Sequence, residues 1–146
     1  MRIYGERLAA LFDGGARVLL EGPLGAGKTT LVQEVLQAMG VTEPVTSPTF
    51  DLLHIYERPD LKVYHADLYR LEHREELLVL DLPGPEEPGI LLLAEWGSLL
   101  REDYPERFDI EIENFGGERR QVSMTAWGEN PVNRLRDWAE EAQHGF

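Results

Sequence analysis

The segment that most constrains the fold spans residues 22–29 and reads Gly-Pro-Leu-Gly-Ala-Gly-Lys-Thr, which matches the pattern G-x-x-x-x-G-K-[ST] in full. The apolar run before it, residues 17–21, is typical of a strand buried on both faces. Residues 28–39 carry apolar side chains at helical spacing and are followed by Gly40, a helix stop. A buried strand, a glycine-rich turn and a helix in this order predict a phosphate-binding loop in an α/β fold.

The residue types of this loop indicate its chemistry. Glycines let the backbone turn tightly and direct successive N–H groups into one concavity, to which the following helix adds its positive dipole end. The ammonium of Lys28 can reach the β- and γ-phosphates, and the Thr29 hydroxyl is the kind of oxygen ligand that Mg²⁺ prefers. Thr30 is placed to donate on the α-phosphate side. We therefore expect nucleotide binding with Mg²⁺.

Length and composition favour a single domain over residues 1–146. Apolar residues make up 42% of the chain and charged residues 28%, which is ordinary for a soluble globular protein. The longest strongly apolar run, residues 90–94, is far shorter than the ~20 residues of a membrane-spanning helix. The chain has no cysteine, which excludes disulfides, thiolate metal sites and a cysteine nucleophile. Because residues 1–6 show no secretion signal, we expect a cytoplasmic protein without membrane contact.

The net charge of −13 is unevenly distributed. Residues 1–50 carry 4 basic and 5 acidic groups, whereas residues 51–146 carry 10 and 22. The phosphate loop therefore lies in the nearly neutral third of the chain. An acidic chain is repelled by phosphate backbones, so we expect no DNA binding and only indirect contact with RNA. Arg119 and Arg120 form a basic pair too short to make a nucleic-acid patch.

The remaining pattern alternates helices and strands. Helices are expected over residues 5–12, 72–80 and 131–142. Strands are expected over residues 51–56, 62–66, 89–96, 108–113 and 121–126, and prolines and glycines in residues 83–89 predict an exposed connection. This order predicts an α/β, P-loop NTPase-like three-layer fold with a mixed central sheet, parallel around residues 17–40 and antiparallel toward the end of the chain.

Two acidic residues end predicted strands and could complete the site. Glu95 follows the most apolar strand, and Asp67 follows a weaker one. A carboxylate at such a position can bind the metal directly or through water, or polarise the attacking water. Either acid could instead cap the turn or helix that follows. We favour Glu95 as the acid on the metal side and assign Asp67 to water activation or to support of the metal ligands.

Two neighbours of these acids have less specific interpretations. His65 is expected to be a packed or hydrogen-bonded residue rather than a metal ligand, because no second histidine stands at a ligand spacing. Trp96 follows Glu95 directly and could stack on a nucleotide base or belong to the core.

Four motifs in order resemble the bacterial TsaE family, also called YjeE: the phosphate loop at residues 22–30, Val-Thr-Ser-Pro-Thr-Phe at 45–50, His-Ala-Asp-Leu-Tyr-Arg at 65–70, and Glu-Trp at 95–96. The resemblance runs from about residue 4 to residue 126. Phosphate loops are common to many families, whereas the second and third motifs at these separations are more specific.

The resemblance implies a role for each matching residue. It assigns Lys28, Asp67, Glu95 and Thr49 to catalysis, with Thr49 in a switch-like loop that senses the γ-phosphate. It assigns Thr29 and Glu95 to the Mg²⁺ ion. It assigns nucleotide binding to Gly25, Ala26, Gly27, Lys28, Thr29, Thr30 and Trp96.

The resemblance also implies a function. Members of the family are small P-loop ATPases needed to make N6-threonylcarbamoyladenosine at tRNA position 37, and their partners are the proteins TsaB and TsaD. By this resemblance we expect ATP or ADP with Mg²⁺ as ligands, weak ATP hydrolysis alone, and a partner-dependent switch role. Two alternatives stay open: a small-molecule P-loop kinase, and a nucleotide-sensing module without turnover.

Overall fold

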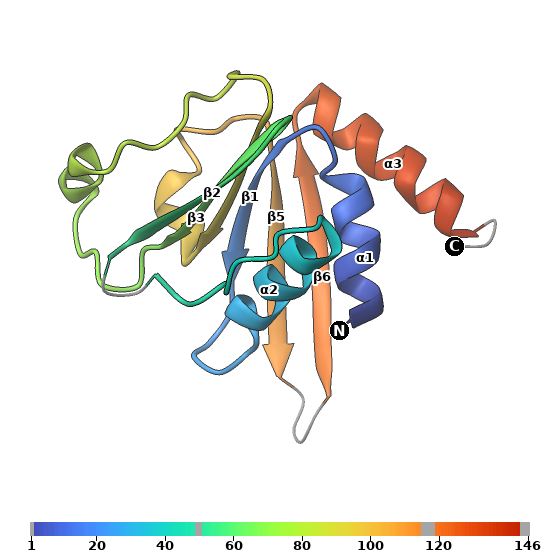
Figure 1. Ribbon diagram of the computed structural model, residues 1–146, viewed down its shortest axis with the longest axis horizontal. Coiled ribbons are helices and arrows are strands. Elements are labelled where there is room, and N and C mark those ends of the chain that lie inside the picture. The colour runs from blue at the N-terminus through green and yellow to red at the C-terminus, as the bar shows by residue number, and fades with distance from the viewer. Residues whose placement is uncertain (1, 49–50, 115–118, 144–146) are drawn as a thin grey trace.

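The computed structural model describes residues 2–48, 51–114 and 119–143. Helices are interspersed with strands along the chain, and two pairs of strands follow one another directly (Figure 1). The helices are α1 (Arg2–Leu11), α2 (Lys28–Ala38) and α3 (Glu129–Gln143), with short 3-10 helices η1 (Arg74–Val79) and η2 (Gly97–Leu100). The strands are β1 (Ala16–Glu21), β2 (Leu53–Arg58), β3 (Leu61–Asp67), β4 (Ile90–Glu95), β5 (Arg107–Asn114) and β6 (Arg120–Trp127).

The six strands form one sheet in the order β2-β3-β4-β1-β5-β6. The inner strands β3, β4, β1 and β5 run parallel, and the edge strands β2 and β6 are antiparallel to their neighbours. The mixed sheet is therefore confirmed, as is the antiparallel pairing expected toward the end of the chain. Parallel pairing places the carboxyl ends of β1, β3 and β4 at one edge of the sheet.

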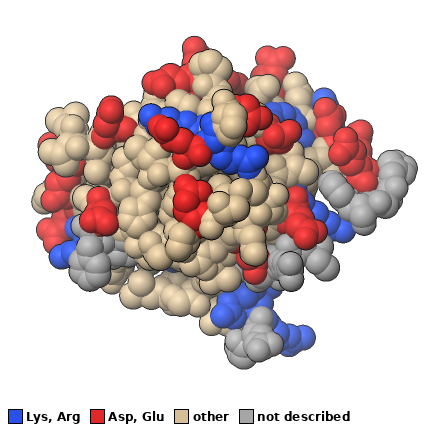
Figure 2. All heavy atoms as spheres, viewed as in Figure 1, with Lys and Arg blue, Asp and Glu red and all other residues tan. Residues whose placement is uncertain are grey.

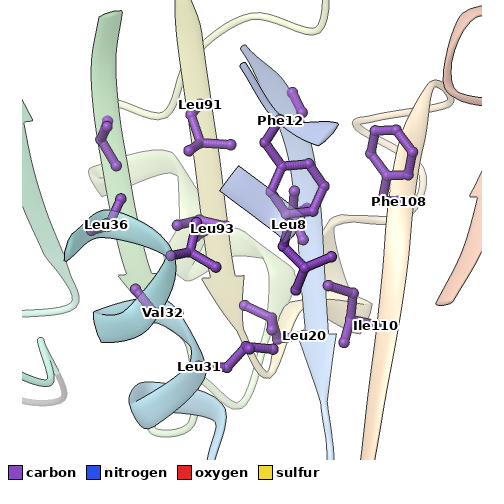
Figure 3. Packing of buried hydrophobic residues seen from close by; sticks show 14 of the residues in the cluster. Leu8, Phe12, Leu20, Leu31, Val32, Leu36, Leu91, Leu93, Phe108 and Ile110 are labelled. Atoms are coloured by element: carbon purple, nitrogen blue, oxygen red, sulfur yellow. The ribbon is translucent and has the colours of Figure 1, made fainter. Parts of the chain in front are cut away.

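One face of the sheet is covered by the three α-helices (Figure 1). Apolar residues of α1 and α2 interdigitate with the strands beneath them, and the rings of Phe12 and Phe108 pack with centroids 5.4 Å apart (Figure 3). The labelled core residues are Leu8, Phe12, Leu20, Leu31, Val32, Leu36, Leu91, Leu93, Phe108 and Ile110. Among the described residues, no helix is long and apolar enough to cross a membrane.

The third layer, on the opposite face, is built mostly from irregular chain. It is formed by the segments on either side of β4, residues 68–82 with η1 and residues 97–104 with η2. The apolar side chains of these segments pack on Leu19, Leu92 and Ala94 of the sheet. The short helix expected over residues 72–80 is a 3-10 helix limited to Arg74–Val79, and none of its residues is buried. Its apolar residues do not form one buried stripe: Leu78 and Val79 are more than four-fifths exposed.

Arg17 ties the connection that precedes β4 to the sheet. Its guanidinium is buried and donates to the carbonyls of Ile90 at 2.8 Å, Gly84 at 2.7 Å and Glu87 at 2.9 Å. Burial lowers the pKa of Arg17, and the nearby Tyr104 and Glu87 oppose that shift. Residues 83–89, which were expected to be an exposed connection, therefore have backbone carbonyls that are hydrogen-bonded to a buried side chain of β1.

We expect Arg17→Met to lower the free energy of unfolding by about 2–4 kcal/mol, because three carbonyls lose their donor at once. Arg136→Met is the matched control: the Arg136 side chain is exposed, so its replacement should change stability by less than ~0.5 kcal/mol. Urea unfolding of both variants measures the difference. Equal stabilities would show that the anchor contributes nothing.

Candidate functional site

Two positions of the phosphate loop require glycine, each for a different structural reason. The loop runs between Glu21, the last residue of β1, and Lys28, the first residue of α2. Gly22 lies so close to β5 that a Cβ there would be 2.5 Å from the Ile112 carbonyl oxygen. Gly27 precedes the helix with φ 106°, a left-handed conformation that costs glycine little. The motif is thus required both by packing and by backbone conformation.

Lys28 folds back over its own loop. Its ammonium donates to the Gly22 carbonyl and, at 3.0 Å, to the Pro23 carbonyl, and it lies 4.1 Å from the centroid of the Trp96 ring. Burial lowers the pKa of Lys28, while the charges of Glu95, Glu21 and Asp67 oppose the shift. A cation is therefore present at the floor of the loop, where a phosphate would meet it.

The end of β4 meets the start of α2 through a short chain of hydrogen bonds. The Thr29 hydroxyl lies 2.7 Å from Glu95 Oε1 and 3.0 Å from Oε2, and His65 Nε2 lies 2.6 Å from Oε2. His65 and Glu95 are both buried. An ionised carboxylate only accepts hydrogen bonds, so both the hydroxyl and Nε2 donate to it. His65 Nδ1 has no hydrogen-bond partner among the described residues.

Asp67 lies beside Glu95, because these two residues are register partners in the parallel pair β3–β4. Its Oδ1 accepts from the Tyr69 backbone N–H at 3.1 Å, and its Oδ2 accepts from the Ser47 hydroxyl at 3.3 Å. Asp67 therefore caps the turn after β3, which was one of the two readings of a strand-end acid. The same carboxylate also faces the loop that carries Ser47.

Trp96 lies at the edge of the site. Its backbone is left-handed (φ 57°), and its ring packs on the Tyr69 ring with centroids 5.0 Å apart. The indole is partly exposed and lies against the ammonium of Lys28. Trp96 also packs against the apolar residues beneath it, as one of the two alternatives expected, and its stacking on a nucleotide base stays a prediction.

A cavity of about 370 Å³ joins these groups. Its lining contains most of the site residues predicted from the sequence, and it also includes Leu24, Ser47 and Tyr69. The predicted residues in the lining are Gly25, Gly27, Lys28, Thr29, Thr30, Asp67, Glu95 and Trp96. Ala26 is buried behind the loop and does not line the cavity. Thr49, the expected γ-phosphate sensor, lies outside the described residues, so its role stays a prediction.

The oxygen ligands in the cavity suit a Mg²⁺ ion that also binds phosphate and water. They are too few for a metal ion that is held by protein side chains alone. Thr29 and Glu95 offer hard oxygen ligands side by side. In the described ranges, no three or more His, Cys, Asp or Glu side chains form a group that could hold a metal ion. Mg²⁺ is commonly bound by one or two protein oxygens together with phosphate oxygens and water, which matches this sparse donor set.

Comparison with known proteins decides the family. The model of the family described as "Threonylcarbamoyl adenosine biosynthesis protein TsaE" matches residues 1–122. This chain belongs to the TsaE family. The tRNA threonylcarbamoyladenosine biosynthesis protein TsaE of Bacillus subtilis is 40% identical over 134 residues, which cover 91% of this chain and 81% of that protein. The TsaE protein of a Nostoc species is 51% identical over 98 residues, 64% of this chain and 57% of that protein.

A solved structure agrees with this assignment. The crystal structure of Bacillus subtilis YdiB superposes with a TM-score of 0.74 and 28% identity, covering 97% of this chain and 88% of that one. The α/β, P-loop NTPase-like fold with a mixed sheet is therefore shown for this TsaE-family chain.

Sequence reasoning missed three contacts of the site. Ser47 bonds Asp67, Tyr69 packs on Trp96, and Arg120 donates to the Ala26 carbonyl at 2.9 Å. His65 was expected to be hydrogen-bonded, and that expectation is confirmed. Residues two apart on a strand share a face, so the sequence places His65 on the same face as Asp67. It carries no local signal for the actual partner, Glu95, which lies on another strand. Nothing local could indicate the contact of Arg120, which lies 94 positions from Ala26.

We expect His65→Leu to lower the free energy of unfolding by about 2 kcal/mol, because a buried carboxylate oxygen of Glu95 then loses a donor. His65→Gln is the matched variant, since its amide nitrogen can donate from nearly the position of Nε2, and it should cost less than ~1 kcal/mol. Chemical unfolding of both proteins measures the difference. If Leu and Gln cost the same, the hydrogen bond to Glu95 is not what His65 contributes.

Proposed function

We propose that this TsaE-family protein binds ATP with Mg²⁺ and hydrolyses it as a component of tRNA threonylcarbamoyladenosine biosynthesis. The main support is the hydrogen bond from the Thr29 hydroxyl to Glu95 at 2.7 Å, which joins the phosphate loop to a buried acidic strand end. A loop that only binds anions has no need of a buried carboxylate beside it. A carboxylate next to a hydroxyl suits a divalent cation between protein and phosphates.

Binding begins with the backbone of the loop. The N–H groups at the start of α2 and the ammonium of Lys28 receive the phosphate oxygens. Lys28 exchanges its bonds to the Gly22 and Pro23 carbonyls for bonds to phosphate. Thr30 lines the same cavity and donates on the α-phosphate side.

Thr29 and Glu95 are the residues that we propose as ligands of the Mg²⁺ ion. When bound, the ion would neutralise charge that develops on the phosphates during transfer. His65 keeps one oxygen of Glu95 hydrogen-bonded. The carboxylate therefore keeps its orientation while Thr29 turns its lone pairs toward the ion.

We assign the attacking water to Asp67. Its carboxylate lies in the cavity lining next to Glu95 and accepts hydrogen bonds from Ser47 and the Tyr69 backbone. A carboxylate in this position can orient a water molecule and accept its proton. The loop that carries Ser47 continues to Thr49, so a γ-phosphate that orders this loop would also adjust Asp67.

The switch role and the partners belong to the same proposal. We propose that TsaB and TsaD stimulate the weak turnover of this chain, that tRNA is contacted only through them, and that residues 1–146 act as one cytoplasmic ATPase domain. The continuous six-stranded sheet supports the single domain. The net charge of −13 supports docking on a basic partner rather than direct contact with tRNA.

The small-molecule kinase is the weaker alternative. A kinase of this class normally needs a mobile lid with arginines near the phosphates. Residues 81–89 contain no arginine, and Arg17 ties the Gly84 and Glu87 carbonyls to the amino-terminal end of β1, the end opposite the phosphate loop. The other alternative, a nucleotide-sensing module, would bind ATP in the same way but would not hydrolyse it. The turnover measurements below distinguish it from our proposal.

Lys28→Ala should reduce ATP binding at least about tenfold and bring turnover to background, because a charge-assisted contact to phosphate is lost. Lys62→Ala is the matched control, since Lys62 is the other lysine of the chain and lies at the opposite end of the sheet. Turnover is measured for the chain alone and with TsaB and TsaD. Unchanged turnover on adding the partners would contradict the partner-dependent role, and no turnover under any condition would favour the sensing module.

Asp67→Asn and Glu95→Gln separate the two acids. We expect Asp67→Asn to lower kcat about 100-fold with little change in ATP affinity, because proton acceptance is lost. We expect Glu95→Gln to raise the Mg²⁺ concentration needed for half-maximal turnover about tenfold, because the ion loses a charged ligand. Steady-state kinetics at varied ATP and Mg²⁺ give both quantities. The reverse pattern would exchange the roles of the two residues.

A further inference from the structure

Arg120 begins β6, and its side chain reaches the phosphate loop from the neighbouring hairpin. Its Nε donates to the Ala26 carbonyl at 2.9 Å. Its Nη1 donates to Asn114 Oδ1 and to the Arg119 carbonyl, both at 3.2 Å, so residues of the same hairpin brace the guanidinium. Figure 2 shows basic side chains gathered at the hairpin end of the molecule, where Arg119 is exposed. Arg120 differs from its neighbour because its Nε bond reaches the buried Ala26 of the phosphate loop.

The contact with Ala26 orients one peptide of the loop. A trans peptide is planar, so its C=O and N–H groups point in opposite directions. Because the Ala26 carbonyl points toward Arg120, the Gly27 N–H points away from it, and Gly27 lines the cavity. Gly27 has no side chain that could fix this peptide plane locally. The direction of this donor therefore depends on a residue far away in the sequence.

The same hairpin also supports the beginning of the loop. Gly22 packs against the Ile112 carbonyl of β5, and Ala26 is bonded from β6. Ala26 is buried, which limits the replacement of the guanidinium by water. The loop is thus supported near both of its ends by the β5–β6 hairpin.

We propose that Arg120 is a positioning residue of the phosphate loop, which fixes the Ala26–Gly27 peptide so that the Gly27 N–H is directed at bound phosphate. This inference rests on the proposed function, because it requires phosphate in the cavity. Arg120 acts through the Ala26 carbonyl and not through its charge. Its effect is therefore distinct from the general attraction that any arginine of the hairpin exerts on ATP.

Arg120→Leu and Arg119→Leu form a matched pair, because each removes one positive charge from the same hairpin. Calorimetry gives the dissociation constants of ADP and of inorganic tripolyphosphate, both with Mg²⁺. We expect Arg120→Leu to weaken both ligands roughly tenfold, the order of one misdirected hydrogen bond to a charged group. Arg119→Leu should stay within about twofold of the unmodified protein, because the exposed charge is screened.

A third variant, Arg120→Lys, keeps the charge but places a methylene group where Nε donates to Ala26. It should weaken both ligands as Arg120→Leu does, and it serves in place of Arg120→Leu if the leucine variant does not fold. In both variants the amide resonance of Gly27 should shift or broaden in the ligand-free protein. This readout reports on the peptide itself and does not respond to a loss of overall stability.

Three results would overturn the inference. Equal weakening by Arg119→Leu and Arg120→Leu, or wild-type affinity in Arg120→Lys, would show that charge alone matters. An unchanged Gly27 amide in a folded variant would show that Arg120 does not set the peptide. If the unmodified protein bound neither ADP nor tripolyphosphate, the proposed function would fail instead, and the Gly27 resonance would still test the role of Arg120.

Discussion

In-register parallel pairing of β3, β4 and β1 determines where this chain can carry out chemistry. Asp67 is the partner of Glu95, and Glu95 is the partner of Leu20, so two carboxylates emerge beside the strand that leads into the phosphate loop. The Thr29 hydroxyl meets Glu95 only because α2 starts at the same edge of the sheet. A shift of β3 or β4 by one residue would turn the acid on that strand to the opposite face and separate the two carboxylates.

Much of the site could be predicted because its constraints are local. Backbone conformation at Gly27 and close packing at Gly22 belong to a short segment, and the pattern of residues 22–29 reports both. The two acids could be found because each ends an apolar strand. The order of the two strands in the sheet could not be predicted from these patterns, since it depends on pairing between segments distant in sequence. The hydrogen bonds of Glu95 to Thr29 and His65 depend on that order. So does the hydrogen bond of Asp67 to Ser47.

Local sequence patterns did not reveal features that depend on contacts between distant parts of the chain. Arg17 was read as part of a buried apolar run, yet its guanidinium organises residues 84–90. Residues 72–80 have helix-forming composition, yet only a short 3-10 helix forms there, because its apolar side chains do not make one buried stripe. The third layer covers β3, β4 and β1 more than the β5–β6 hairpin, whose outward residues on β6, Gln121, Ser123, Thr125 and Trp127, are exposed. Long-range contacts of this kind carry no periodic signal.

If the loop binds phosphate as we propose, the contacts of Lys28 have a consequence for which anions the loop selects. Its ammonium is already solvated by the Gly22 and Pro23 carbonyls and by the Trp96 ring, so an incoming anion replaces interactions instead of filling a vacant charge. A small anion such as chloride or a single phosphate recovers little from this exchange. A polyphosphate chain gathers several backbone donors and the lysine together, so its gain exceeds the loss. Under the proposed function, the loop therefore favours a polyphosphate over monovalent and monophosphate anions.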